Sequence, residues 1–280
     1  MSVFDEFLRA RDADVEASRG IVGSSDSRRR RRLMDSLSRE MGFSSTNTPD
    51  IIGHEHKLQS EFYEPVRHQV HISEDNVSPA VLAHELGHAS FRSAKAMDRL
   101  NFHLAGLASS TGQDIVAGAT MSILNNRLAN RSLSKKQIGA ALAGLGVIGL
   151  GNYSRYKEEQ RASERAMSAI NKLKHSIGFT SEDTSRSNEL LSKALNTYKH
   201  GLPINALAQT AGGVIIGGGA HLLGRLVGND VEHLDQAAYA VPVINTGLRG
   251  LLYSLTVGRD KPLNRLLGKP EGSYRPLEDD

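Results

Sequence analysis

Two histidines four residues apart, with a glutamate directly after the first, are the residues whose types and spacing best suit chemistry. They are His84, Glu85 and His88. On an α-helix, positions i and i+4 share one face, so both imidazoles can bind one metal ion. Glu85 lies beside that face, close enough to take a proton from a water molecule on the metal. The H-E-x-x-H pattern therefore indicates a hydrolytic zinc site with Glu85 as general base.

The residues around this motif predict the helix that must carry it. Ser78 is a suitable N-cap, and Pro79 suits the first helical position. Apolar residues then recur at helical spacing, which predicts a buried stripe next to the histidine face: Leu82, Leu86 and Ala89.

Polar and apolar residues alternate over 66–72, which predicts a half-buried strand. In zincins an edge strand lies beside the metal helix and pairs with an extended substrate peptide. His54 and His56 precede this segment. They are candidate extra ligands, but loop or strand positions are the simpler interpretation because a two-histidine zincin site does not need them.

Composition restricts the ligand set and the compartment. The 280 residues include no cysteine, so a zinc site must use histidine or carboxylate ligands, and disulfides contribute nothing. The N-terminus lacks the pattern of a secretory signal, so export by the usual route is not expected. The net charge is +3. The run Arg28–Arg32 favours either an anionic lipid or nucleic-acid contact or the solvated start of a helix, and no other feature indicates nucleic acid.

Composition also divides the chain. We expect a basic helical region at 1–50, a metallopeptidase core at 51–200, a glycine-rich apolar helical region at 201–265 and a flexible tail at 266–280. Within the core, 104–124 and 138–151 are apolar helices. Each glycine costs a soluble helix about 1 kcal/mol relative to alanine, whereas membrane helices tolerate glycine well. Since a full span needs about 20 apolar residues, membrane insertion and tight soluble packing both stay open.

A catalytic zinc ion has three protein ligands, so a third should follow the two histidines. The best candidate stretch is the polar helix at 159–166, about 70 residues downstream. Its competing interpretation is a solvated helix with i,i+4 ion pairs.

With this helix, the chain resembles the gluzincin peptidases of the HtpX heat-shock and CAAX prenyl protease type. In those families a helix with E-x-x-A-D-x-x-A follows the H-E-x-x-H motif, often after Ser-Arg. Glu159 fits this pattern through Ala162 and Ala166, whereas the position of Ser154-Arg155 would make Glu158 the ligand. Ser163 stands where the family has aspartate. The family also often carries a downstream His-Pro pair, for which His200 is the candidate here, as a stabiliser of the transition state.

The resemblance implies a mainly α fold with a small β-sheet and zinc held by His84, His88 and Glu159. The implied activity is a metalloendopeptidase acting on protein or peptide substrates, in contact with membrane lipid and on the cytoplasmic side. The alternative is a membrane-interacting structural or delivery protein, for example in a phage particle, with an auxiliary or decayed zinc site. The sequence sets no oligomeric state.

Overall fold

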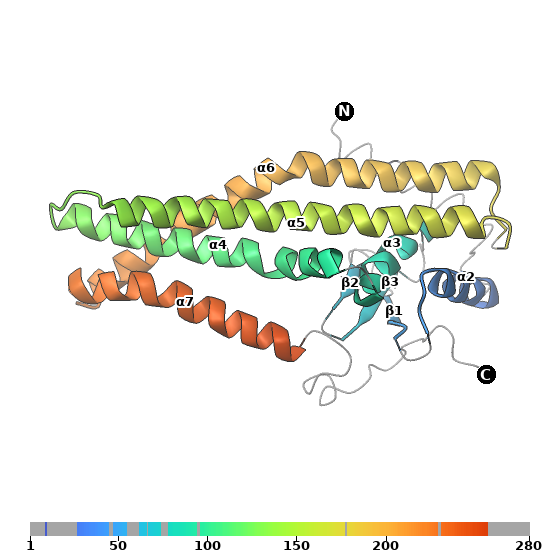
Figure 1. Cartoon of the computed structure of the whole chain (residues 1–280), viewed down its shortest axis with the longest axis horizontal. Coiled ribbons are helices and arrows are strands. Elements are labelled where there is room, and N and C mark those ends of the chain that lie inside the picture. Colours follow the sequence, from blue (N-terminus) through green and yellow to red (C-terminus); the bar gives the residue numbers. More distant parts are fainter. Residues whose placement is uncertain are drawn as a thin grey trace. The chain divides into compact units, whose positions relative to one another are not determined.

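Helices make up most of the protein, with one small mixed sheet, as the sequence predicts. The computed structural model describes residues 9, 27–44, 47–54, 62–65, 67–73, 78–93, 96–176, 178–228 and 231–256. Figure 1 shows the elements: α2 (Ser27–Glu40), β1 (Asp50–His54), β2 (Phe62–Glu64), β3 (Gln69–Ser73), α3 (Pro79–Ala89), the 3-10 turn η1 (Ser90–Ser93), α4 (Ala96–Leu128), α5 (Lys135–Leu173), α6 (Ser181–Leu226) and α7 (Val231–Thr256).

The chain folds into two compact units that are not consecutive blocks of sequence. Unit 1 comprises Met1–Arg99, Lys157–Lys199 and Leu255–Asp280, and unit 2 comprises Leu100–Tyr156 and His200–Ser254. The expected apolar helix 138–151 has no end of its own, because α5 continues without a break from Lys135 to Leu173. Likewise α6 runs through the expected boundary at 200. The tail at 266–280 lies outside the described residues.

The sheet of unit 1 has the order β1-β3-β2, with β1 parallel and β2 antiparallel to β3. The strand predicted at 66–72 is therefore the central strand, and the expectation that it would be the edge strand is wrong. Of the two strands at the edges, β2 is the one against which α3 packs, and α3 also packs against β3. Strand order depends on pairing with residues distant in sequence, so alternation alone could not reveal it.

The predicted strand is also shorter than its alternation indicates, because it begins at Gln69. His68 has a φ of 57°, a left-handed conformation that an extended strand excludes. Two hydrogen-bond contacts of 2.7 Å hold its buried ring in place, from Nδ1 to the Tyr63 hydroxyl and from Nε2 to the Asn47 carbonyl. These side-chain contacts fix the turn that leads into β3.

Helix α3 begins as the sequence predicts. Ser78 is the N-cap, its hydroxyl accepts a hydrogen bond from the Val81 N–H, and Pro79 is the first helical residue. The predicted stripe is confirmed, because Leu82, Leu86 and Ala89 are fully buried. They belong to a core with apolar residues of α2, β1, β3, α5 and α6, including Leu37, Ile51, Val70, Ile170 and Leu190.

Helix α2 contains the arginine run. It starts at Ser27, so Arg28–Arg32 form its first turns. A helical start fits both interpretations of this run, and its role stays a prediction. Arg32 is exposed, and the side chains of residues 27–31 are outside the described part. From Leu33 onward the helix becomes amphipathic and packs Leu33, Met34 and Leu37 into the core of unit 1.

Candidate metal centre

Helices α3 and α5 cross closely in unit 1, and the crossing positions the candidate site. A Cβ atom added to Gly87 would lie 2.6 Å from the carbonyl oxygen of Ala162, so only glycine permits this approach. Ala162 and Ala166 are fully buried at the contact. The alanine spacing of α5 is therefore a packing pattern, and it places Glu159 over the histidines of α3.

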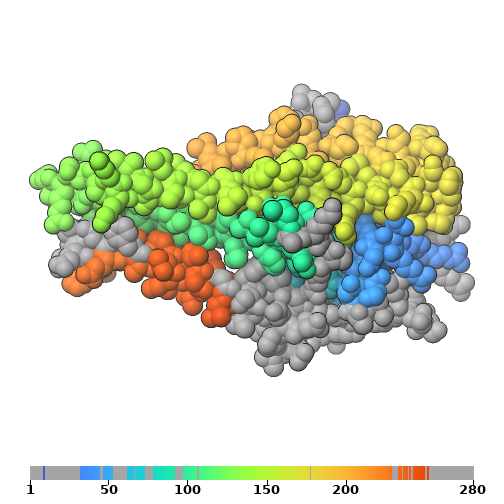
Figure 2. Space-filling view, in the orientation of Figure 1, coloured from blue at the N-terminus to red at the C-terminus, as the bar shows by residue number. Residues whose placement is uncertain are grey.

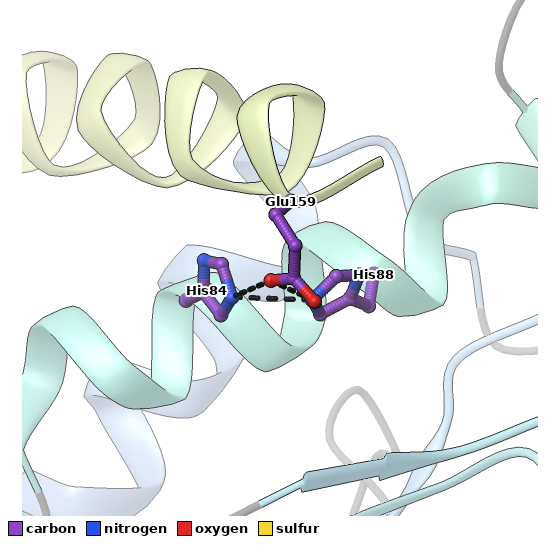
Figure 3. Close-up of side chains that lie close together, drawn as sticks. All are labelled: His84, His88 and Glu159. Atoms are coloured by element: carbon purple, nitrogen blue, oxygen red, sulfur yellow. Dashed lines mark hydrogen bonds and ion pairs between the residues drawn. The ribbon is translucent and has the colours of Figure 1, made fainter. Parts of the chain in front are cut away.

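Three donor atoms converge at this crossing (Figure 3). The Nε2 atoms of His84 and His88 are 3.1 Å apart, and Oε2 of Glu159 lies 3.1 Å and 3.2 Å from them, respectively. All three side chains are mostly buried. Four-coordinate zinc with ligand bonds of about 2.0–2.1 Å separates its donors by about 3.3 Å. The donor set and its spacing therefore fit such an ion.

The other ring nitrogen of each histidine also has a partner. Nδ1 of His84 lies 3.2 Å from the Ser163 hydroxyl, and Nδ1 of His88 lies 3.1 Å from Oε1 of Glu158. Metal-binding histidines usually donate this second N–H to a carboxylate, a backbone carbonyl or water, which fixes the ring orientation and leaves Nε2 free to bind. Glu158 is such a partner for His88, and the Ser163 hydroxyl takes the same place on His84. Glu158 therefore contacts Nδ1 of His88, the ring nitrogen that faces away from the other two donors. Of the two glutamates, Glu159 is the one whose carboxylate lies next to both Nε2 atoms.

Arg161, which the sequence did not indicate as a site residue, links Glu158 to the C-terminal end of α3. Its guanidinium makes a bidentate pair with Glu158, with Nε 2.8 Å from Oε2 and Nη2 2.5 Å from Oε1. Nη1 donates to the Ser90 hydroxyl and Nη2 to the Gly87 carbonyl, each at 3.0 Å. The arginine therefore anchors Glu158 and also satisfies the C-terminal end of α3.

Glu85 lies next to the histidines on α3 and is buried. The backbone N–H of Tyr63 on β2 donates to its carboxylate. Burial raises the pKa of Glu85 above its ordinary value, against the opposing effect of the two histidines. A carboxylate with a raised pKa is a better proton acceptor near neutral pH.

Charges within the site favour a tightly bound proton in the absence of a cation. Burial opposes a charged His88, but the Glu159 and Glu158 carboxylates outweigh it and raise the pKa of His88 to about 10. Burial likewise opposes ionisation of Glu159, but the facing histidines hold its pKa well below the usual range. The site is thus electrostatically suited to a positive charge between these three side chains.

Of the remaining candidates, the structure describes the side chain of His200 alone. His200 belongs to unit 2, where its side chain is exposed on α6, so its suggested role stays a prediction. His54 ends β1, but its side chain lies outside the described part, as does the whole of His56. Among the residues that the structure describes, His84, His88 and Glu159 form the group with metal-binding geometry.

Comparisons of the chain with protein-family models, with curated proteins and with solved structures found no match. The function must therefore be inferred from the geometry of the site.

Proposed function

We propose that this protein is a zinc-dependent peptide hydrolase, with His84, His88 and Glu159 as ligands and Glu85 as general base. The observation that carries the proposal is the triangle of donor atoms, with sides of 3.1–3.2 Å, beside a buried glutamate with a raised pKa. The orienting bonds from Ser163 and Glu158 add support, because a solvated helix would not need them.

Zinc in such a site supplies Lewis acidity, which polarises a substrate carbonyl and lowers the pKa of water. Glu85 accepts a proton from the attacking water at its carboxylate and returns it to the amine nitrogen as the C–N bond breaks. The Tyr63 N–H holds this carboxylate in place. Arg161 acts at a distance, by fixing the carboxylate that orients His88.

The choice of a peptide as substrate is supported by β2. This strand pairs with β3 on one side, and no described strand pairs with its other side. An extended peptide can add to such an edge through backbone hydrogen bonds. Because Tyr63 of β2 touches Glu85, a peptide on this strand would lie next to the proton acceptor.

Metal content and hydrolysis together test the proposal. We expect the purified full chain to bind one zinc ion and to cleave fluorescein-labelled denatured casein. Glu85→Gln should keep the zinc and lose at least about 100-fold in rate, the usual size of a general-base contribution. Glu159→Gln should lose the zinc. Glu164→Gln is the matched control, because Glu164 is an exposed glutamate on the same helix that bonds Gln160.

Full activity in Glu85→Gln would exclude the mechanism. A parent protein that binds no zinc in chelator-free buffer would exclude the metal centre. If that protein still bound lipid vesicles, the structural or delivery role would replace the peptidase.

A further inference from the structure

Unit 2 exposes many large apolar side chains, whereas a soluble domain buries most of them. Among the described residues, every exposed large hydrophobic side chain except Phe62, Met97 and Tyr198 belongs to unit 2. Leu142 on α5 is 63% exposed, while Ile215 on α6 and Val243 on α7 are each 73% exposed. Figure 2 shows α5 at the molecular surface. Soluble monomers seldom expose so many large apolar side chains on one unit.

The interior of unit 2 is built from small residues around α4. A Cβ on Gly112 of α4 would lie 2.6 Å from the Ile148 amide nitrogen of α5. A Cβ on Gly217 of α6 would collide with the Ala117 carbonyl, and one on Gly118 would collide with the Ala238 carbonyl of α7. Helix α4 therefore touches α5, α6 and α7 backbone to backbone, the packing that small residues allow between membrane helices.

Polar side chains in this interior bond one another. Gln137 of α5 donates to both the hydroxyl and the carbonyl of Ser122 on α4, and it accepts from Asn126. Asn152 of α5 donates to Gln209 of α6 and to the Ile148 carbonyl. Asp114 of α4 pairs with Arg249 of α7 at 3.0 Å. In hydrocarbon, polar groups need such internal partners.

Among the described helices, α6 is the one found both long and apolar enough to cross a bilayer, and α5 has the length. Residues 137–154 of α5 contain no acidic or basic side chain, and at 1.5 Å per residue they extend about 27 Å, close to the hydrocarbon thickness of about 30 Å. Helix α6 is long and apolar enough to span, and only 17% of its apolar window is buried. A core helix of a soluble protein would be mostly buried, so the exposed window favours contact with lipid.

One end of unit 2 is basic. The segment 125–136, which joins α4 to α5, carries four basic residues and no acidic one: Arg127, Arg131, Lys135 and Lys136. Helix α6 runs parallel to α4, since Gly212 and Gly217 face Gln113 and Ala117, so Arg225 reaches the same end. These five outnumber the two acidic residues in the first turns of α7, Glu232 and Asp235, even when Asp230, which precedes the helix in the sequence, is added. Basic residues next to apolar helices favour anionic lipid headgroups.

We propose that unit 2 is embedded in a lipid bilayer, with the basic α4–α5 end against anionic headgroups. A second copy of the chain is a weaker candidate for the partner. The exposed apolar side chains project from three helices that each pack against α4. A dimer interface would cover one face of this group and leave apolar side chains on the others exposed.

Because the chain has no cysteine, single cysteines can report depth in the full-length protein. Leu142→Cys, Ile215→Cys and Val243→Cys, each carrying an environment-sensitive nitrobenzoxadiazole label, are reconstituted into phosphatidylcholine vesicles with 30% phosphatidylglycerol. We expect blue-shifted emission and quenching by doxyl-labelled lipid at all three positions. Ser185→Cys, an exposed position on the unit 1 part of α6, should show neither. Unquenched labels together with cross-linked dimers would overturn the proposal.

Charge removal tests the orientation. The triple change Arg131→Gln, Lys135→Gln and Lys136→Gln should lower partitioning into the anionic vesicles on the order of 100-fold, from about 1 kcal/mol per basic residue. Partitioning into pure phosphatidylcholine should not change. Equal partitioning of parent and variant into anionic vesicles would refute the basic end as a lipid contact. His88→Ala should insert like the parent, so failure of the zinc site and failure of insertion are distinguishable.

Discussion

At the scale of single residues, the site depends on side chains that orient the metal-binding histidines. Glu158 and Arg161 form a buried pair with side chains 5% and 9% exposed. Ser163 takes the corresponding position on His84 with a neutral hydroxyl. The two histidines are therefore oriented by partners of different charge, and the partners can be tested separately.

Glu158→Gln should weaken zinc binding by about 10- to 100-fold without abolishing it, because an amide can still accept from His88 but no longer pairs with Arg161. It should also lower the free energy of unfolding by about 3 kcal/mol, because a buried guanidinium is left without its partner charge. Competition with a chromophoric chelator and urea denaturation measure the two effects.

Ser163→Ala provides the comparison. It should weaken zinc binding to a similar extent at little cost in stability, because no charge is left unpaired. Ser168→Ala, an exposed serine on the same helix, controls for the substitution itself. If Glu158→Gln bound no zinc and Glu159→Gln bound it normally, Glu158 would be the ligand.

The histidines and the start of their helix could be predicted from the sequence, whereas the role of Arg161 could not, for a physical reason. The i,i+4 spacing of His84 and His88 and the Ser78-Pro79 start follow from local helix geometry. Arg161 lies among Glu158, Glu164 and Arg165, a pattern typical of a solvated helix face. Only the approach of α5 to Gly87 buries Arg161, and that approach depends on packing between segments distant in sequence.

At the scale of elements, the crossing of α3 and α5 sets the position of Glu159. Gly87→Ala should destabilise unit 1 by about 1–3 kcal/mol, because its Cβ would press on the backbone of Ala162 and overpack the contact. Zinc affinity should fall as well, since the two helices must separate. Gly149→Ala is the control, because its Cβ meets nothing within 4 Å. A Gly87→Ala variant with parental stability and zinc affinity would show that the contact is not limiting.

The start of α6 carries a capping box formed by Thr180 and Asp183. The Asp183 carboxylate accepts from the Thr180 N–H at 2.9 Å, and the Thr180 hydroxyl accepts from the Asp183 N–H at 3.1 Å. Burial opposes the charge on Asp183, but the bonds from Thr180 and the nearby Arg186 outweigh it and lower the pKa of the carboxyl.

Asp183→Asn should therefore cost about 1 kcal/mol of stability at pH 7. A carboxyl whose pKa is lower in the folded protein stabilises it fully above the ordinary aspartate value of about 3.9, and this contribution is lost as the pH falls through the lower value. The difference between parent and variant should thus shrink between pH 4 and pH 2. Urea denaturation at a series of pH values measures it, and a constant difference would contradict the assignment.

At the scale of the whole molecule, the site joins two helices that lie far apart in the sequence. His84 and His88 come from α3 and Glu159 from α5, so a metal that binds all three cross-links unit 1 only when it is folded. A ligand that binds the folded state alone stabilises it by about 4 kcal/mol at 1,000 times its Kd. Unit 2 supplies none of the three donors.

Zinc removal should therefore lower the melting temperature of unit 1 on the order of 10 °C, since about 2–4 °C accompany each kcal/mol at this size. Calorimetry of the full chain, with excess zinc and with chelator, measures the shift. His88→Ala should melt at one temperature under both conditions, whereas His175→Ala, an exposed histidine outside the site, should behave like the parent. A transition that responded to zinc equally in His88→Ala would place the metal elsewhere. A second transition unaffected by zinc would belong to unit 2. Its helices pack through glycine contacts and through hydrogen bonds of buried side-chain amides, and none of these groups is a proposed metal ligand.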